Sequence, residues 1–444
     1  MDCLPLELLH TVCRHLPTAD VGDFRLVSKT FAVVGIQYLL PEVHVMFHSH
    51  SLARIEAISK HPVLRQYVTS IFYEGDTLNF YKTPRSWSRD TVPPHVREWY
   101  LADRHSAGSY VEKYAYTRGL GRIERAPRAP FSKDESIQGW QHYRVLMSDQ
   151  SQLHLRQWEQ ILPSSLKRFP RLKSFTHSTG THLRRRTPTM HRLYDPSLLR
   201  PDGDLGHFAL CGYGTLNRLL VAAGHCCDSK FETLKAGWVL WQFFLVSREL
   251  FEVMKRGVKH LKVLSLSIST HRRDEVDGVH EVIDASFGCL KESGKMLEFL
   301  TSAPHLRELE VRFKMDSRGH RCPADLAHIV GDFTWPMLTS VCFDSIRTNE
   351  KSLLAFFQRH AAKLREVKLR YIFLTSGTWR SIFEGMRQIL SLQKFDTIND
   401  LNGVGEVWKL SSALSKALER YLIDGGQECP LLDDAFAECR RITD

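Results

Sequence analysis

A short pattern of alternating apolar residues recurs along most of the chain and limits what the chain can fold into. Each copy has the form aliphatic-x-x-aliphatic-x-aliphatic, and residues 261–266, with the sequence LKVLSL, are the clearest example. Alternation of this kind predicts a short β-strand with one buried face. The copies lie at residues 68–73, 172–175, 231–234, 261–266, 306–311, 338–343, 364–369 and 392–395.

Helical stretches separate these predicted strands, at residues 243–256, 290–301, 352–359 and 379–389. Strand-plus-helix units that recur every 26 to 45 residues or so resemble an irregular leucine-rich-repeat solenoid. In a solenoid, stacked units bury their apolar faces jointly, with the strands on the concave side and the helices on the convex side. We therefore expect an α/β chain in which most of the length is such a solenoid.

A doubly wound α/β domain is the alternative architecture, because it also alternates strands and helices. The Asn or Cys that builds the usual leucine-rich-repeat ladder is missing from most copies, which keeps this alternative open. A lead-in such as Pro304-His305-Leu306 recurs in phase with the strands, and this favours the solenoid.

Two predicted insertions, near residues 74–168 and 177–205, break the repeat. The first is rich in aromatic and basic residues, and we expect a loop at 118–130 and a helix over 136–166 within it. A last helix over 407–421 precedes Gly425-Gly426, which is the expected way for a helix to end. Such a helix would cap the open end of the solenoid.

The first 45 residues follow a different pattern, that of three short helices. Pro5 suits the first position of a helix, where its missing N–H is not needed. Leu8, Leu9, Val12, Cys13 and Leu16 then recur at steps of three and four, so we expect them to share one helical face. Asp20 is a good N-cap residue for the second helix. Phe24, Val27 and Phe31 again step by three and four, so the apolar faces of the helices converge.

This spacing resembles the F-box, a helical module that binds the Skp-type adaptor of a cullin–RING ubiquitin ligase. The matching positions are Leu4, Pro5, Glu7, Leu8, Val12, Leu16, Pro17, Asp20, Val21, Arg25, Val27, Ser28, Lys29 and Phe31. Phe31 occupies a position where Trp is common, and it keeps the aromatic packing without the indole N–H donor. The resemblance implies that the adaptor-facing surface is formed or supported by Leu4, Pro5, Leu8, Val12, Leu16, Val27 and Phe31.

An F-box followed by degenerate leucine-rich repeats is the arrangement of the divergent F-box proteins of filamentous fungi, which this chain resembles most. We expect the F-box at residues 1–45, a substrate-binding solenoid at 46–424, and a C-terminal tail at 425–444.

The excess positive charge of the chain is concentrated in one segment. Its net charge is +10, and no acidic residue occurs between Gln160 and Tyr194, where eight Lys and Arg residues lie. This distribution argues against a nucleic-acid surface that covers the whole protein. Arg184, Arg185 and Arg186 could bind an acidic or phosphorylated substrate, serve in nuclear targeting, or lie in a solvated loop.

No sequence motif predicts catalysis, a cofactor or a metal. The groups His44-His48-His50 and His177-His182-His191 lack Cys or Glu at zinc-site spacing. The Gly-x-Gly pairs lack the third glycine of a dinucleotide site, and neither a Walker loop nor a nucleophile elbow is present. We expect a chain that is not an enzyme, with no cofactor and no resident metal.

The distribution of cysteines and the hydropathy of the chain predict the cellular compartment of the protein. The ten cysteines are scattered without a C-x-x-C pair, which is typical of reduced thiols in a cytoplasmic or nuclear protein. The N-terminus lacks a signal peptide, and the longest apolar stretch, residues 236–246, is too short to span a bilayer. We expect a cytoplasmic or nuclear protein, or both, that binds neither membrane nor nucleic acid.

These observations lead to one functional hypothesis and two alternatives. The hypothesis is a substrate-recognition subunit of a ubiquitin ligase built from a Skp-type adaptor, a cullin and an F-box protein, which binds its target through the repeats. The first alternative is an F-box-containing interaction scaffold without a dedicated degradation substrate. The second is an enzyme that uses the region from Gly212 to Cys227 in a doubly wound fold, where a ligand would bind at the switch point of the sheet.

Overall fold

The computed structural model describes residues 4–46, 48–74, 83–85, 87, 133–153, 155–178, 206–225, 231–269, 288–313, 324–398, 401–426, 428–432 and 439–442. The insertion loop expected at 118–130 and the arginines at 184–186 lie outside these residues.

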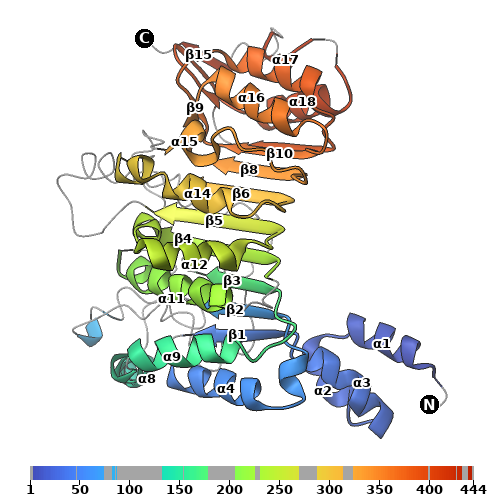
Figure 1. The fold of residues 1–444 in the computed structure, drawn as a ribbon, viewed down its shortest axis with the longest axis vertical. Helices are drawn as coiled ribbons and strands as arrows, with labels where there is room; N and C mark the ends of the chain where they lie inside the picture. Colours follow the sequence, from blue (N-terminus) through green and yellow to red (C-terminus); the bar gives the residue numbers. More distant parts are fainter. Residues whose placement is uncertain are drawn as a thin grey trace.

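A nine-stranded parallel sheet forms the body of the molecule, and its strand order follows the order of the chain (Figure 1). The strands are β1 (Glu42–Met46), β2 (Ser70–Glu74), β3 (Ser174–Ser178), β4 (Thr233–Leu240), β5 (Val263–Ser269), β6 (Glu308–Phe313), β8 (Ser340–Asp344), β10 (Glu366–Arg370) and β12 (Lys394–Ile398). Eight of these nine strands coincide with the predicted copies of the apolar pattern to within a few residues, and β1 was not predicted.

The order of the strands excludes the doubly wound alternative for this sheet. A doubly wound sheet reverses its strand order once, at the switch point where ligands bind. The order from β1 to β12 contains no reversal, because each new strand pairs with the strand that precedes it in the sheet. The doubly wound prediction is therefore wrong for the described part of the chain, and the enzyme hypothesis that depends on a switch point loses its site.

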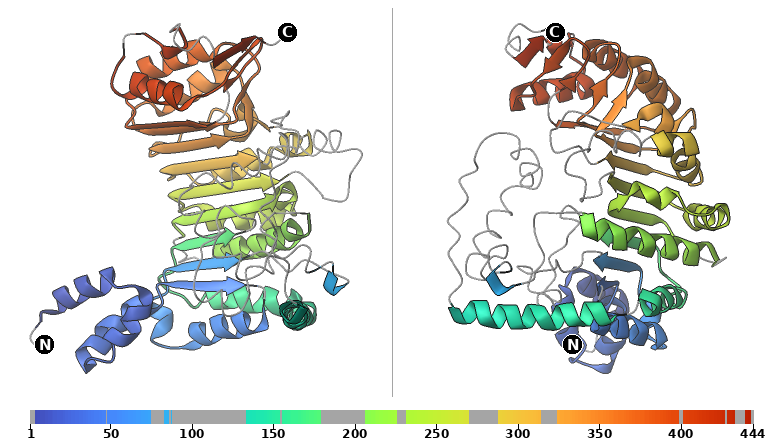
Figure 2. Two further views of the ribbon diagram at one scale, coloured as in Figure 1. Left: turned by 180° about the vertical axis from the view of Figure 1, so that it is seen from behind. Right: turned by 90° about the vertical axis from the view of Figure 1, so that its left-hand side faces the viewer.

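Helices cover one face of this sheet (Figure 2). They are α4 (Ser49–Lys60), α9 (Leu155–Leu166), α11 (Gly206–His225), α12 (Arg248–Val258), α14 (Lys295–Thr301), α15 (Leu326–Val330), α16 (Glu350–His360), α17 (Trp379–Ile389) and α18 (Ser412–Ile423). The helix predicted over 136–166 is two helices, α8 (Lys133–Gln152) and α9.

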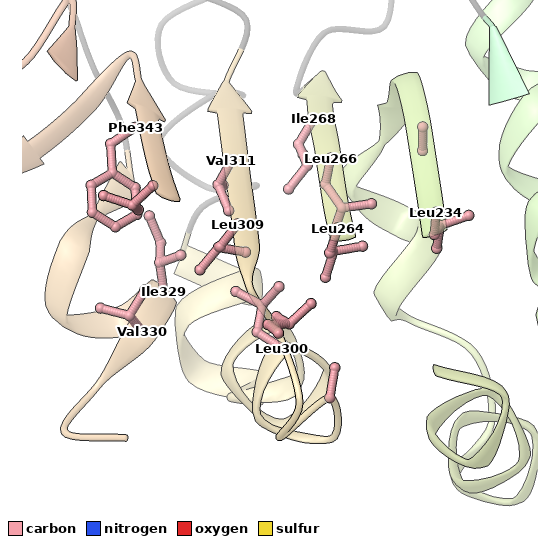
Figure 3. Close-up of a cluster of buried hydrophobic side chains, with 14 of the residues drawn as sticks. Leu234, Leu264, Leu266, Ile268, Leu300, Leu309, Val311, Ile329, Val330 and Phe343 are labelled. Carbon is pink, nitrogen blue, oxygen red and sulfur yellow. The ribbon is translucent and has the colours of Figure 1, made fainter. Parts of the chain in front are cut away.

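The main core lies between the sheet and these helices. Alternate residues of each strand point toward the helices and are buried, as Leu264, Leu266 and Ile268 of β5 are (Figure 3). They pack in one continuous cluster with residues such as Leu309 and Val311 of the next strand.

The other face of the sheet carries mostly polar residues. Over β2 to β5 its residues are largely buried, as Phe72, Thr176 and Ser267 are, whereas over β6 to β12 its charged residues are partly exposed. The part of this face over β6 to β12 is called the open face below.

The backbone carbonyl directly before each strand accepts hydrogen bonds from the next strand-plus-helix unit. The carbonyl oxygen of Lys262 accepts hydrogen bonds from the N–H groups of Arg307 and Glu308, at 2.7 and 3.0 Å. The same two-donor arrangement occurs at all eight junctions of the sheet. Its acceptors are the carbonyls of Pro41, Thr69, Lys173, Glu232, Lys262, Arg307, Thr339 and Arg365. Because only backbone atoms take part, this carbonyl ladder requires no particular side chain.

A second, smaller sheet lies at the C-terminal end of the body. Its strands, in spatial order, are β15 (Arg440–Ile442), β14 (Glu406–Trp408), β13 (Leu401–Asn402), β11 (Phe373–Leu374), β9 (Ile346–Thr348) and β7 (Ala324–Asp325). Ser345 and Tyr371 have positive φ angles of 60° and 49° and occupy equivalent places directly after β8 and β10. At each of these residues the chain turns out of the first sheet and into the second.

The C-terminal region differs from the expectation at two points. Val407, predicted to begin the last helix, lies in β14, and the helix α18 begins at Ser412. Residues 425–444, predicted as a tail, include β15, which pairs antiparallel with β14. Gly425, at φ 91°, follows α18 as predicted.

Two glycines allow α11 and α12 to touch through their backbones. A Cβ atom on Gly224 would lie 1.9 Å from the carbonyl oxygen of Val253, and one on Gly257 would lie 2.5 Å from that of Leu220. Any larger side chain must therefore push the two helices apart.

We predict that Gly257→Ala destabilises the body by about 1–3 kcal/mol, because it overpacks this contact. Alanine would otherwise favour a helix by about 0.5–1 kcal/mol over glycine. Gly288→Ala is the matched control, because Gly288 also lies in a helical segment of the body and its added Cβ would meet no atom within 4 Å. Urea denaturation should show a lower midpoint for Gly257→Ala only; equal midpoints for both variants would contradict the close contact.

His360 is a buried histidine held in its neutral form. Its Nε2 accepts a hydrogen bond from the Trp335 N–H at 3.0 Å, so its Nδ1 carries the proton and donates to the Phe356 carbonyl at 2.8 Å. Burial lowers the pKa of this imidazole below its usual value, against the opposing effect of the Phe356 carbonyl.

The lowered pKa predicts a loss of stability in mild acid. The unfolded chain binds a proton at His360 near pH 6.5 and the folded chain only at lower pH, so this stabilising contribution is complete above about pH 6.5 and declines below it. Urea midpoints should fall less between about pH 7.5 and 5 in His360→Gln than in the wild type, because the remaining histidines are common to both proteins. Parallel profiles would show that His360 does not contribute.

Candidate functional site

Three helices form a head at the N-terminus of the chain: α1 (Leu6–His15), α2 (Thr18–Phe24) and α3 (Lys29–Leu39). Pro5 immediately precedes α1, and Pro17 separates α1 from α2. Asp20, predicted as an N-cap, instead lies in the first turn of α2, where an acidic side chain is favourable near the positive end of a helix. The N-cap of α3 is Ser28, whose hydroxyl accepts from the Phe31 N–H at 3.4 Å.

The head has a small core of its own. Leu9 and Cys13, one turn apart on α1, pack against Phe31 and Val34 of α3, and all four are buried. Phe24 and Tyr38 lie at the margin of this cluster. No residue of this cluster belongs to the main core of the body. The head therefore buries its apolar residues separately from the body, and it projects from the end of the sheet at which β1 lies (Figure 1).

A neighbouring side of α1 exposes an apolar stripe, which Leu4 extends just before the helix begins. The sequence pattern predicts one shared face for Leu8, Leu9, Val12 and Cys13, whereas the structure divides these residues between an exposed and a buried side. Leu4, Leu8 and Val12 follow one another at four-residue steps and are 45%, 50% and 45% exposed. Of the other residues predicted to face the adaptor, Pro5 and Val27 are exposed, and Leu16 is partly buried. Phe31 is buried in the head core, so it supports this surface from within.

Three further exposed apolar residues of the head were not predicted. They are Leu6, Leu26 and Val33, at 53%, 84% and 67% exposed. Val33 neighbours the buried Val34 on α3, and the helical spacing of Phe31 and Val34 is the signal that places Val33 outside. The head thus presents more apolar surface than its sequence pattern indicates.

Comparison with known protein families identifies this segment. Residues 1–33 match the family model of the F-box domain. The head is an F-box. F-box domains bind Skp-type adaptors in cullin–RING ligases, and proteins that contain them generally act as non-catalytic substrate adaptors. The match therefore supports a general role as an adaptor-binding substrate receptor. No curated protein matches the chain.

The open face of the sheet is a second candidate surface, and charged side chains cross it. The strand register places Glu310, Cys342, Lys368 and Asp396 in one row over β6, β8, β10 and β12. The next row on the same face contains Arg312, Asp344 and Arg370.

Most of these charges are paired. The Arg312 Nε donates to Glu310 Oε1 at 2.6 Å, and the Arg312 guanidinium lies 4.0 Å from the Asp344 carboxylate. Arg370 contacts Asp396 at 3.2 Å. Burial opposes the charge of Arg312, yet Glu310, followed by Cys342 and Asp344, holds the pKa of this guanidinium above its usual value. These contacts join β6 to β8 and β10 to β12 across this face of the sheet.

Cys342 lies within this network and is almost fully buried. Burial, with a further contribution from Glu310, raises the pKa of its thiol to about 12. The thiol is therefore protonated at neutral pH, and a protonated thiol is a poor nucleophile. Cys342 fits a structural role in the sheet.

Of the two histidine groups considered in the sequence, His182 and His191 lie outside the residues that the structure describes. His44 contacts Glu42 at 3.0 Å, whereas His48 lies 3.5 Å from Asp149 of α8. His177 is buried beside the ring of Tyr73. Among the described residues, no group of three His, Cys, Asp or Glu side chains could hold a metal ion. The same residues include no helix long and apolar enough to cross a membrane.

The separate core of the head leads to a prediction about folding. Phe31→Ala removes the largest side chain of a four-residue cluster, and such a change costs about 3–5 kcal/mol. We expect the F-box to unfold while the body remains folded. Hydrogen exchange should then rise at residues 6–39 and stay unchanged at 231–269 and 324–398. Loss of protection in the body as well would show that the two parts fold as one unit.

Proposed function

We propose that this protein is the substrate receptor of a ubiquitin ligase composed of a Skp-type adaptor, a cullin and a RING subunit. The F-box binds the adaptor, and the body binds a target protein. The observation that carries this proposal is the exposed stripe of Leu4, Leu8 and Val12 on a head that has its own core. Apolar surface that is exposed in this concentrated way is typical of a binding site for another polypeptide.

We further propose that the body is an irregular leucine-rich-repeat-like solenoid. Three observations support this: the sequential parallel strand order, the repeated strand-plus-helix units, and the carbonyl ladder that recurs at every junction. Repeat architectures of this kind use their exposed strand face and unit edges to bind other proteins. The open face, with its ordered charges, is a suitable surface for a folded partner or an extended segment.

The receptor contributes proximity to the ligase reaction. A target that is bound to the body is held near the ubiquitin-loaded enzyme, so the effective concentration of its lysine side chains rises. The chain itself supplies no catalytic group in this proposal. The scattered cysteines are consistent with reduced thiols, and we propose a cytoplasmic or nuclear location, or both.

Replacing Leu8 and Val12 together by Glu should abolish co-purification with the Skp-type adaptor. Each carboxylate would have to be desolvated against an apolar partner, which costs several kcal/mol per ion. Both residues are about half exposed, so the substitutions should leave the head folded. Pull-down of the adaptor, with circular dichroism of each variant, measures the effect.

The matched control is Leu250→Glu with Val145→Glu, a Leu and a Val that are 45% and 69% exposed outside the F-box. This variant should bind the adaptor like the wild type. Unchanged adaptor binding by the folded Leu8→Glu, Val12→Glu variant would refute the adaptor assignment. If the adaptor is lost but no bound protein becomes more abundant in cells that carry this variant, the chain is a scaffold without a degradation substrate.

A further inference from the structure

The turns that lead from each helix into the next strand of the large sheet carry an excess of positive charge. In the described part of the chain these turns are residues 61–69, 167–173, 231–232, 259–262, 302–307, 331–339, 361–365 and 390–393. They contain ten Lys and Arg residues and two acidic residues, Glu232 and Asp332. The basic residues are Arg65, Lys167, Arg168, Arg171, Lys173, Lys259, Lys262, Arg307, Lys363 and Arg365.

The parallel sheet brings these residues to one edge of the molecule. All nine strands run in the same direction, so all of these turns lie where the strands begin. Neighbouring strands are about 4.8 Å apart, and the turns therefore form a continuous line of about 40 Å. We call this line the basic edge. The F-box lies at the same edge, because α3 leads directly into the start of β1 (Figure 1).

Some of these basic residues form ion pairs or hydrogen bonds within the protein. Glu232 lies between Lys173 and Lys262, at 3.3 and 3.0 Å from their ammonium groups. Arg365 donates to the carbonyls of Ala362 and Leu364 just beyond α16. These residues stabilise the turns themselves.

Other cations of the basic edge have no acidic partner among the described residues. Lys167, Lys259, Arg307 and Lys363 are exposed, and no carboxylate of the described chain lies within ion-pair distance of them. The negative end of a helix favours cations only within its last turn. That effect accounts for Lys167 and Lys259, which directly follow α9 and α12. Lys363 lies beyond the end of α16 at His360, and Arg307 lies well beyond the end of α14 at Thr301. The backbone at Arg307 is also fixed, since its carbonyl is one of the ladder acceptors.

We propose that the basic edge binds an acidic segment of the target protein, a proposal that rests on the receptor function above. The cations are spread along a line, which suits an extended polypeptide rich in Asp, Glu or phosphorylated residues. Arginine and lysine pair with carboxylate and phosphate through charge-assisted hydrogen bonds. A target held here would lie on the side of the body from which the F-box projects.

Two features favour a polypeptide over a nucleic acid. The first residue of β1, β6 and β10 is a glutamate: Glu42, Glu308 and Glu366. These carboxylates would repel a phosphate backbone, which carries a charge at every nucleotide, more than a peptide whose acidic residues are separated by neutral ones. Single-stranded nucleic acids are usually bound by stacking on exposed aromatic rings. The Tyr67 ring at this edge is instead covered by the Arg171 guanidinium, 5.7 Å from its centroid.

The test uses the full-length protein and a fluorescent peptide of about twelve residues with alternating Glu and Gly, which can span most of the edge when extended. The variant is Lys259→Glu, Arg307→Glu, Lys363→Glu. Its control is Lys291→Glu, Lys351→Glu, Lys416→Glu, which replaces three equally exposed lysines away from the basic edge and changes the net charge by the same amount. Fluorescence anisotropy measures the affinity of each protein for the peptide and for a single-stranded DNA of similar length.

We expect the edge variant to bind the peptide at least about tenfold more weakly than the wild type, and the control variant to change its affinity by less than about twofold. Higher salt should weaken the wild-type interaction. An equal loss in both variants, or tighter binding of the DNA than of the peptide, would overturn the proposal. The edge variant should still co-purify with the adaptor, and the Leu8→Glu, Val12→Glu variant should still bind the peptide. Failure of this inference is thereby separated from failure of the receptor assignment.

Discussion

The carbonyl ladder at the strand starts is the interaction on which the rest of the structure depends. At each of eight junctions one carbonyl oxygen accepts from two consecutive N–H groups of the following unit, and this sets the position at which the next strand begins. The residue directly before each acceptor from Lys173 to Arg365 is a large apolar one that is buried: Leu172, Phe231, Leu261, Leu306, Leu338 and Leu364. The register and the core are therefore fixed at the same point in every unit. Because the contact uses backbone atoms, the side chains of the turns remain free to vary, and in this protein they provide the basic edge.

The F-box and the body each have a hydrophobic core of their own. The head encloses Leu9, Cys13, Phe31 and Val34, whereas the described part of the body contains a large cluster that extends from β1 to the last strands. An apolar stripe can stay exposed on α1 because the stability of the head does not depend on burying it. The open face can be polar for a different reason: the helices already bury the apolar side of the sheet. Ion pairs such as Arg312 with Glu310 then form on that face.

Much of this fold could be predicted from the sequence because its strongest signals are periodic. Alternating apolar residues located eight of the nine strands of the large sheet, and helical spacing located the head and α17. Strand β1 was missed although residues 40–45, LPEVHV, have the aliphatic-x-x-aliphatic-x-aliphatic form, because the sequence analysis assigns residues 1–45 to the F-box. The second sheet could not have been predicted, because its strands are two or three residues long and depend on positive φ angles at Ser345 and Tyr371. Neither residue is a glycine, so the sequence contains no signal for the turn. At the candidate site, spacing placed Leu8, Leu9, Val12 and Cys13 on one face of the first helix, and only the packing against α3 shows that Leu9 and Cys13 lie inside while Leu8 and Val12 lie outside. Spacing could not show that Phe31 lies inside the head either. The basic edge was not recognised either, since its residues are distant in sequence and meet only through the parallel sheet.

The connection between head and body is very short. Helix α3 ends at Leu39, Leu40 packs against the main core, and the carbonyl of Pro41 is the first acceptor of the ladder. Two residues therefore hold the adaptor-binding module in a set orientation to the first strand, with no flexible tether between them. In an assembled ligase the distance between the adaptor and a bound target would therefore be set by the rigid body of this protein. Only those lysines of the target that lie at that distance from the adaptor would be modified.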